Sequence, residues 1–427
     1  MERLVQEFRD IQPAMRKDEV WRHVDFSAML TDRLSLPQGE RQQAEYHCNV
    51  PDLGAERVTV ENGYFYQPDR VTADGVKIAH IGHADGIEVP EIGSFAGRPS
   101  LHDNPYLKFN AAHYTDGVLI QVPDNVTVSK PIQLQSVINA GHGLFLQVRN
   151  RVVVGRNSRV TIIHCDDSYD NAEAFANNVT EISLADGAHL EYYKMQNLNN
   201  STGLLNQIYV AMAQEAEFRS VGVTLNGGHI RNHTEVFMLG EHCDVQAHGL
   251  YLNDQEQLVD NYIFVDHRFP NCHSRELFKG ILDDSARAAF NGHVMVRDGA
   301  TKTEAYQSNK NILLTDKAHV STKPFLEIYN DDVKCSHGST IGQLDEQALF
   351  YIRSRGISER TARTLLLYAF CDEVLQQITL APLRDRLVDL VKKRLHGELT
   401  LCSECALHCS SPCNGPEANF YIDPDKL

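Results

Sequence analysis

Two residues late in the chain combine side chains that bind iron and sulfur. Cys335 and His337 are two positions apart in a segment that reads as a strand, so their side chains share one face. Their Cα atoms are expected roughly 7 Å apart, a span that one bound metal ion or sulfur species can bridge. Thiolate and imidazole are both iron ligands. The competing interpretation is a buried thiol beside a hydrogen-bonded histidine.

A second group of sulfur ligands lies in the C-terminal tail. Its four cysteines follow the spacing C-x2-C-x3-C-x3-C, and four thiolates on a short segment can close around Zn²⁺ or an iron–sulfur cluster. The spacing matches neither the bacterial ferredoxin run nor a usual zinc ribbon. A tail with reduced, unliganded cysteines remains the alternative. The four residues are Cys402, Cys405, Cys409 and Cys413.

The other cysteines offer weaker sites. Cys272 and His273 are adjacent, and neighbours on a strand point to opposite faces, so packing and turn roles are expected for them. The remaining four have no evident partner in the sequence and are expected to be small buried hydrophobes. These four are Cys48, Cys165, Cys243 and Cys371.

Composition narrows the class of protein. The chain has 427 residues, 42% of them hydrophobic and 23% charged, as in ordinary soluble globular proteins. A formal net charge of −17 argues against nucleic acid and anionic membrane surfaces as partners, because both attract basic faces. We see no signal peptide and no apolar run long enough to span a bilayer. Ten cysteines without a secretion signal indicate a reducing compartment, so we expect a cytoplasmic protein.

The elements that position these residues change type along the chain. Helical spacing of Leu4, Val5, Phe8 and Ile11 predicts an N-terminal helix. Residues 38–104 give a mixed signal. From about 107 to 341, short apolar–polar alternations separated by turn residues predict strands. After Gln343 the spacing returns to helical, with Gly356 and Gly397 as stops and Ser358 as an N-cap.

A weak repeat runs through the strand-rich region. A turn residue, a small residue, a polar residue and an apolar residue recur in order, and most neighbouring copies are roughly 30 residues apart, a period typical of solenoids. Stacked coils of this kind form a β-helix, and a β-sandwich is the rival fold. The copies begin at Asn157, Gly187, Glu215, His242 and Lys317.

We therefore predict a mainly β protein with a parallel β-helix core and α-helical ends. Residues 1–104 form an N-terminal helical and mixed region, and residues 105–343 form the β-helix. Residues 344–398 form a C-terminal helical module, followed by the Cys-rich tail at 399–427.

Several segments of the sequence, in order, form a recognisable set: 116–132, 227–232, 249–251, 260, 267–274, 278–282, 290–296, 305–309, 332–338 and 349–357. These segments resemble the SufB/SufD family of iron–sulfur cluster assembly scaffolds. The resemblance covers about residues 100–375, and Trp21 and Arg22 fit the SufD branch.

The resemblance implies a right-handed parallel β-helix that pairs with a SufB-like sister chain. It also implies a SufC-like ABC ATPase that docks on the C-terminal helices, the module at 344–398. The chain itself has no P-loop of the G-x-x-x-x-G-K-S/T type, so ATP hydrolysis would come from another chain. The implied cofactor is a transient iron–sulfur cluster, or iron, shared with the SufB-like partner. Neither the residues nor the resemblance assigns a flavin.

Two positions favour the SufD branch within this family. The residue aligned with the SufB acceptor cysteine is Asn309 here, and an amide cannot replace a thiolate as a carrier of iron or persulfide. SufB chains usually carry an acidic residue where this chain has His337. By resemblance to SufD, His337 faces the SufB cysteine across the subunit interface as a ligand or proton handler, with Cys335 assisting.

The leading hypothesis is thus a non-enzymatic SufD-like scaffold subunit for iron–sulfur cluster assembly. A homomeric, SufB-like holder of a cluster is the alternative, and Asn309 argues against it. A carbohydrate-active β-helix enzyme is a remote third. Its acid–base pair would have to come from adjacent carboxylates, which do not converge on a strand. The adjacent pairs are Asp166 with Asp167, Asp283 with Asp284, and Asp331 with Asp332.

The tail hypothesis predicts a loss of metal on truncation. A chain ending at His396 lacks all four tail cysteines and should lose the zinc or iron that the full chain carries, as measured by elemental analysis after anaerobic purification. Equal metal content in the two proteins would remove the tail site.

Overall fold

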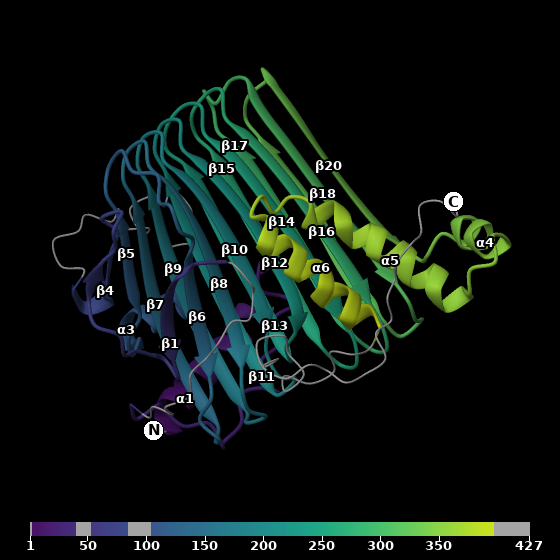
Figure 1. Cartoon of the computed structure of the whole chain (residues 1–427), viewed down its shortest axis with the longest axis horizontal. Helices are drawn as coiled ribbons and strands as arrows, with labels where there is room; N and C mark the ends of the chain where they lie inside the picture. The colour runs from purple at the N-terminus through teal and green to yellow at the C-terminus, as the bar shows by residue number, and fades with distance from the viewer. Residues whose placement is uncertain (1, 40–52, 84–103, 397–427) are drawn as a thin grey trace.

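The computed structural model describes residues 2–39, 53–83 and 104–396. The described chain is about 48% strand and 18% helix, and its strands wind into a β-solenoid of about eight turns. Figure 1 shows the strands side by side, in an order that runs from the N-terminal to the C-terminal part of the chain. The expected parallel β-helix with helical ends is confirmed.

Successive strands of the solenoid alternate between two ten-stranded sheets, which we name after their last strands. The β20 sheet contains, in spatial order, β2 (Tyr64–Phe65), β1 (Glu56–Glu61), β6 (Ile132–Ile138), β8 (Arg159–Ser168), β10 (His189–Asn197), β12 (Glu217–Asn226), β14 (Asp244–Asn253), β16 (His273–Leu282), β18 (Thr303–Leu313) and β20 (Val333–Gly342).

The β19 sheet faces it across the interior. Its strands, in spatial order, are β19 (His319–Ile328), β17 (Arg287–Val296), β15 (Leu258–His267), β13 (His229–Met238), β11 (Thr202–Met212), β9 (Ala174–Leu184), β7 (Leu144–Val154), β5 (Val118–Val122), β4 (Lys77–His80) and β3 (Arg70–Val71). Pairing is parallel from β5 and β6 onward, and the antiparallel pairs all involve β2, β3 or β4.

Four of the five repeat copies lie in turns that lead into strands of the β20 sheet, whereas the fifth copy, at Lys317, lies in the turn that leads into β19 of the other sheet. Asn157, Gly187, Glu215 and His242 all have φ between +54° and +64°, the left-handed region. The residue after each of them is small and fully buried, because neighbouring coils stack closely there. These small residues are Ser158, Ala188, Ala216 and Cys243. The repeat is therefore a turn signal, as expected.

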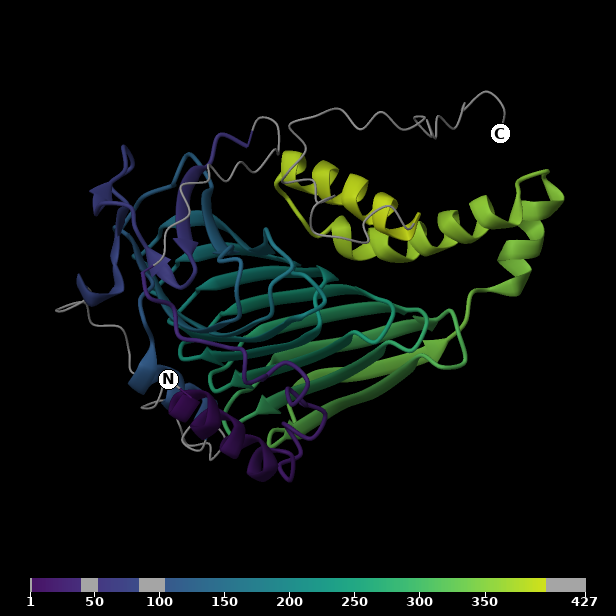
Figure 2. The ribbon, with the colours of Figure 1, turned by 90° about the horizontal axis from the view of Figure 1, so that it is seen from below.

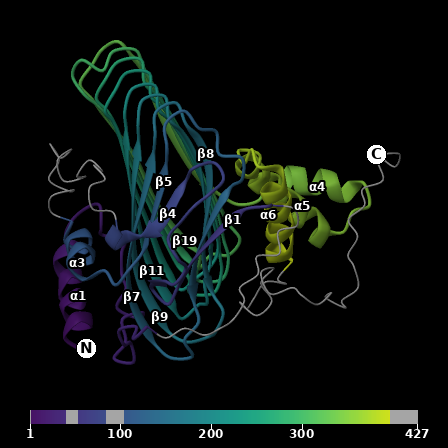
Figure 3. The same cartoon turned by 60° about the vertical axis from the view of Figure 1, so that its left-hand side comes forward.

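Residues 2–34, which we call the N-terminal segment, cover the outer face of the β19 sheet together with helix α3 (Pro105–His113). Helix α1 (Glu2–Met15) and helix α3 lie side by side on that face, opposite the C-terminal helices (Figure 3). Phe8 of α1 contacts the rings of Tyr106 and Phe109 on α3 and those of Phe145 and Phe175 on the sheet, with centroids 5.1–5.4 Å apart. These contacts bury the apolar face that the spacing of α1 predicts.

Helix α3 corrects the expectation of strands from about residue 107. Two local features start this helix: the Asn104 side chain accepts hydrogen bonds from the backbone N–H groups of Tyr106 and Leu107, and Pro105 suits a first helical turn. A nine-residue helix with a weak apolar stripe is hard to distinguish from a strand by periodicity.

Trp21 fastens the N-terminal segment to the middle of the β19 sheet. Its ring is buried and stacks on His233, with centroids 4.8 Å apart and planes 7° from parallel. The guanidinium of Arg231 lies 5.0 Å from the Trp21 ring centroid and pairs with Asp260 at 2.5 Å. Arg231 also donates to the Val20 carbonyl. The sheet and the segment therefore share one buried aromatic and ionic contact.

The C-terminal helices cover the outer face of the β20 sheet. Helix α5 (Glu359–Leu375) and helix α6 (Ala381–Leu395) lie along that face, whereas α4 (Glu346–Ser354) projects beyond the end of the solenoid (Figure 2). The Ser358 side chain caps α5 as predicted. Arg394 ties α6 to the sheet through the Leu225 carbonyl and Asp254. Within the described residues no helix is both long and apolar enough to cross a bilayer.

Replacement of Trp21 by alanine should loosen the N-terminal segment. The change removes a fully buried indole and one of the two aromatic rings that Arg231 contacts, so we expect a loss of about 3–5 kcal/mol in the free energy of unfolding, measured by chemical denaturation. Phe269→Ala is the matched control, because Phe269 is an exposed aromatic residue whose truncation should cost little. Equal losses in the two variants would show that Trp21 does not hold the segment.

Candidate functional site

The solenoid ends in an uncovered coil. Strands β19 and β20 make this last coil, and among the described residues no strand pairs with their outer edges. Residues of β20 are mostly exposed, whereas the equivalent inward positions of β18 are buried. Four large apolar side chains are exposed here: Phe325, Ile328, Tyr329 and Ile341. An unpaired edge with exposed apolar side chains is typical of a surface that another chain covers.

Cys335 and His337 both lie on this last coil. In the register of β18 and β20, Cys335 is opposite Ala305 and His337 is opposite Gln307. Ala305 and Gln307 are buried positions that face the interior, so both candidates are on the inward-facing side of β20, at its open end. Cys335 packs against the small cluster that contains Val294 and Ala305, and partial burial raises the pKa of its thiol. His337 is exposed.

Beneath the last coil, Asn309 is held in the interior. Its side-chain amide donates to the Tyr251 hydroxyl and to the Phe278 carbonyl, both at 3.3 Å. Its oxygen accepts a hydrogen bond from Asn311 at 2.7 Å. Asn309 is fully buried. Position 309 therefore holds an amide that hydrogen-bonds within the interior, and it offers no thiolate to a metal ion.

A buried carboxyl group lies two coils below His337. Glu276 on β16 is opposite Gln307 in the register, and Gln307 is opposite His337. The Gln307 amide donates to Glu276 Oε2 at 2.5 Å. Burial raises the pKa of Glu276 to about 8, and the Gln307 hydrogen bond lowers it only in part. Sequence analysis missed this pair, although the 31-residue separation fits the period of the solenoid.

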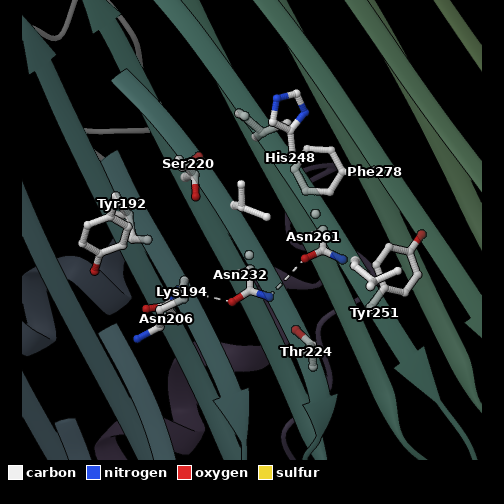
Figure 4. Close-up of a pocket in the computed structure, with 18 of the residues that line it drawn as sticks. Tyr192, Lys194, Asn206, Ser220, Thr224, Asn232, His248, Tyr251, Asn261 and Phe278 are labelled. Carbon is white, nitrogen blue, oxygen red and sulfur yellow. Dashed lines mark hydrogen bonds between the residues drawn. The ribbon is translucent and has the colours of Figure 1, made fainter. Parts of the chain in front are cut away.

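Figure 4 shows a separate polar cavity deeper in the interior. Its volume is about 60 Å³, and it lies between the two sheets. Asn206, Asn232 and Asn261 stack on neighbouring strands, with amide hydrogen bonds of 3.2 and 3.1 Å between them. Lys194 lines the same cavity and pairs with buried Asp166 at 2.8 Å. The amide stack satisfies part of the hydrogen-bonding capacity of these side chains, whereas Asn206 Oδ1 and Asn261 Nδ2 have no hydrogen-bond partner within the described part of the chain.

The described residues contain no cluster of three or more His, Cys, Asp or Glu side chains placed to hold a metal ion. Cys335 and His337 thus supply at most two ligands, and further ligands would come from another molecule. The tail cysteines Cys402, Cys405, Cys409 and Cys413, together with Cys48, lie outside the described residues.

Two cysteines for which the sequence suggested no shared site are neighbours in the structure. Cys243 and Cys272 occupy adjacent coils, are fully buried, and interact through their thiols. Both Sγ atoms approach the Gly240 carbonyl, at 3.3 and 3.4 Å. Their separation of 29 positions matches the repeat, which was the signal available in the sequence. His273, next to Cys272, is exposed.

Comparison with known proteins matches nearly the whole described chain. A family model described as "SUF system FeS cluster assembly, SufBD core domain" matches residues 136–370, and one described as "SufBD protein N-terminal region" matches residues 2–134. The chain belongs to the SufBD family. It is therefore a protein of iron–sulfur cluster assembly, which confirms the resemblance drawn from the sequence.

Individual SufBD relatives are distant but cover almost the full length. The SufD protein of Escherichia coli is 27% identical over 387 residues, which is 90% of this chain and 89% of that protein. A SufBD family protein of Synechocystis is 28% identical over 398 residues, with 89% and 87% covered. The chloroplastic protein ABCI7 of Arabidopsis thaliana is 27% identical over 400 residues, with 88% and 82% covered.

The Glu276→Gln variant should change how stability depends on pH. The Glu276 pKa is about 8 in the folded chain, above its ordinary value of 4.5, so the folded state holds this proton more tightly than the unfolded state. The contribution of this proton to the free energy of unfolding is complete below pH 4.5. It is lost as the pH rises toward 8, by at most roughly 1.4 kcal/mol per pH unit. Glutamine cannot ionise. The variant should therefore gain stability relative to the parent between about pH 5 and 8.

Thermal unfolding of the two proteins, compared at each pH, measures this effect, because all other titrating groups are shared. A stability difference that stays constant across the range would contradict a raised pKa at Glu276.

Proposed function

We propose that this chain is a SufD-like, non-catalytic scaffold subunit that pairs through its last coil with a SufB-like sister chain. The observation that carries the proposal is the uncovered end of the solenoid. There, the unpaired edge of β20, four exposed apolar side chains and the Cys335–His337 pair lie together. A second solenoid placed on this end would satisfy the backbone groups and cover the apolar residues.

Pairing at this end would also complete a site that the chain only begins. Cys335 and His337 are two ligands on an inward face, and a sister chain would supply the rest of the coordination shell. We infer that a transient iron–sulfur cluster or iron ion is cargo held between the two chains, with His337 as a ligand or proton handler and Cys335 assisting. Asn309, buried and hydrogen-bonded, argues against a SufB-like chain that holds the cluster alone.

A SufC-like ATPase is the second partner that we propose, docked on the C-terminal helices. Helix α4 projects from the body and carries Phe350 and Tyr351, which are 74% and 60% exposed. Beside it is a cavity of about 470 Å³ with a mixed lining, in which Leu344 and Leu349 lie among charged residues that include Arg353. Exposed aromatic residues with an adjacent arginine are typical of the centre of a protein interface.

We infer a reducing compartment, the cytoplasm, as the place where this assembly works. The five cysteines in the described part of the chain are all free thiols, as expected where disulfides are not maintained. Cys243 and Cys272 remain unbonded although they are adjacent.

Two charge substitutions separate the two proposed interfaces. Ile341→Asp places a charge on the uncovered coil, so it should abolish binding of a SufB-like chain and leave ATPase binding intact. Phe350→Asp on α4 should abolish binding of a SufC-like ATPase and leave the sister chain bound. The partners, taken from the same cells, are mixed one at a time with the tagged chain under anaerobic conditions. Affinity is measured by calorimetry, and at least a hundredfold loss is expected because a buried charge is left unpaired.

Val71→Asp is the matched control, because Val71 is an exposed valine on β3, far from both surfaces. It should bind both partners with parental affinity. Retention of the sister chain by Ile341→Asp, or of the ATPase by Phe350→Asp, would remove the corresponding interface from the proposal.

A further inference from the structure

Three inward-facing residues form a column that ends at the candidate site. Glu276, Gln307 and His337 are opposite one another on β16, β18 and β20. Neighbouring strands of a sheet are about 4.8 Å apart, so the three residues occupy adjacent positions in one line across the sheet. Glu276 and Gln307 are buried, whereas His337 is exposed at the open end. The column connects the interior of the solenoid with the surface where a partner would bind.

The Gln307 side chain extends across the interior toward the β19 sheet. A Cβ atom on Gly292 of β17 would lie only 2.2 Å from Gln307 Nε2, so the absence of a side chain at Gly292 makes room for the amide. Nε2 donates to Glu276, and Oε1 is buried without a hydrogen-bond partner. A buried amide oxygen without a donor costs free energy, and a donor supplied by another group would remove this cost.

The buried carboxyl group of Glu276 is not compensated by an ion pair or by several hydrogen-bond donors among the described residues. A carboxyl group is expensive to bury unless a cation or several donors compensate it. Among the described residues no salt bridge to Glu276 is found, and Oε1 has no hydrogen-bond partner. What the carboxyl does provide is a fixed acceptor that holds the Gln307 amide by its nitrogen.

We propose that Glu276 and Gln307 are positioning residues for the imidazole of His337. This inference rests on the proposed function, in which His337 is a ligand or proton handler. Glu276 fixes the amide of Gln307, and Gln307 Oε1 accepts the N–H of one imidazole nitrogen once a partner covers the last coil. The other imidazole nitrogen then carries the lone pair, directed away from the interior toward an iron ion of the shared cluster. Hydrogen bonds that fix the tautomer and orientation of a histidine ligand are a general feature of metal sites.

A double-mutant cycle tests this assignment. The readout is the cluster yield per complex, from iron and sulfide content and the visible spectrum, after anaerobic reconstitution of the assembled complex. Loss of an outer hydrogen bond typically weakens metal binding 10–100-fold, so Gln307→Leu should lower the yield at limiting iron by about tenfold. Glu276→Leu should do the same, because it releases the amide. Glu276→Gln should retain the parental yield, because its side-chain oxygen can still accept from Gln307.

The decisive comparison is between His337→Ala and the double variant with Gln307→Leu. If Gln307 acts through His337, the cluster yield of the double variant should equal that of His337→Ala alone. Additive losses, or a parental yield in Gln307→Leu, would overturn the positioning role. A parental yield in His337→Ala would instead show that the proposed function of His337 is wrong, so the two failures are distinguishable.

Gln196→Leu controls for damage to the fold. Gln196 is also a buried, inward-facing glutamine of the β20 sheet, and its side chain hydrogen-bonds to Asn232, but it is four strands from β18. It should reduce stability while leaving cluster yield per assembled complex unchanged. A tenfold loss of yield in this variant as well would assign the Gln307→Leu effect to general packing and overturn the proposal.

Discussion

Backbone hydrogen bonding between successive coils is the interaction on which the rest of this structure depends. Each strand from β6 to β18 is paired in parallel on both sides, in a register that places inward side chains directly over one another. Because the side chains stack as well, a polar residue facing the interior can be satisfied by a polar residue one coil away, as Asn232 is between Asn206 and Asn261. The same constraint leaves the last coil incomplete, since β20 has a neighbour on one side only.

The two outer faces of the solenoid are covered by the chain's own ends. The N-terminal segment packs on the β19 sheet, where Trp21, Arg231 and His233 make a stacked and ionic contact, and it reaches the final coils through a salt bridge between Glu19 and Lys323. Helices α5 and α6 cover the β20 sheet. With both faces covered in this way, large exposed apolar side chains are concentrated at the end of the solenoid and on helix α4. This is the reason that the proposed partners are assigned to these two surfaces.

The position of the candidate site follows from this arrangement. Because the coils stack in register, residues at equivalent positions of successive coils lie in one line across the sheet. His337 is at the open end of the line that contains Gln307 and Glu276. A residue in the middle of the solenoid would be enclosed, as Lys194 and Asp166 are. At the open end, an inward-facing residue is instead accessible to a second chain while its support comes from the interior. Under the proposed function, the solenoid would therefore present His337 to a second chain without a deep pocket of its own.

The amino-acid sequence was enough to predict the class of fold, because a turn repeat of roughly 30 residues and alternating strands favour stacked coils over the rival β-sandwich. It also determined the family, through segments spread over most of the chain, and the shared face of Cys335 and His337, through their spacing of two. Only the tertiary structure decided which residues of different coils meet. The pairing of Cys243 with Cys272 and the column of Glu276, Gln307 and His337 depend on the register between strands, which bulges and unequal coil lengths adjust. Helix α3 likewise depends on its packing against β7 and β9, because the local periodicity of nine residues was too weak to specify it.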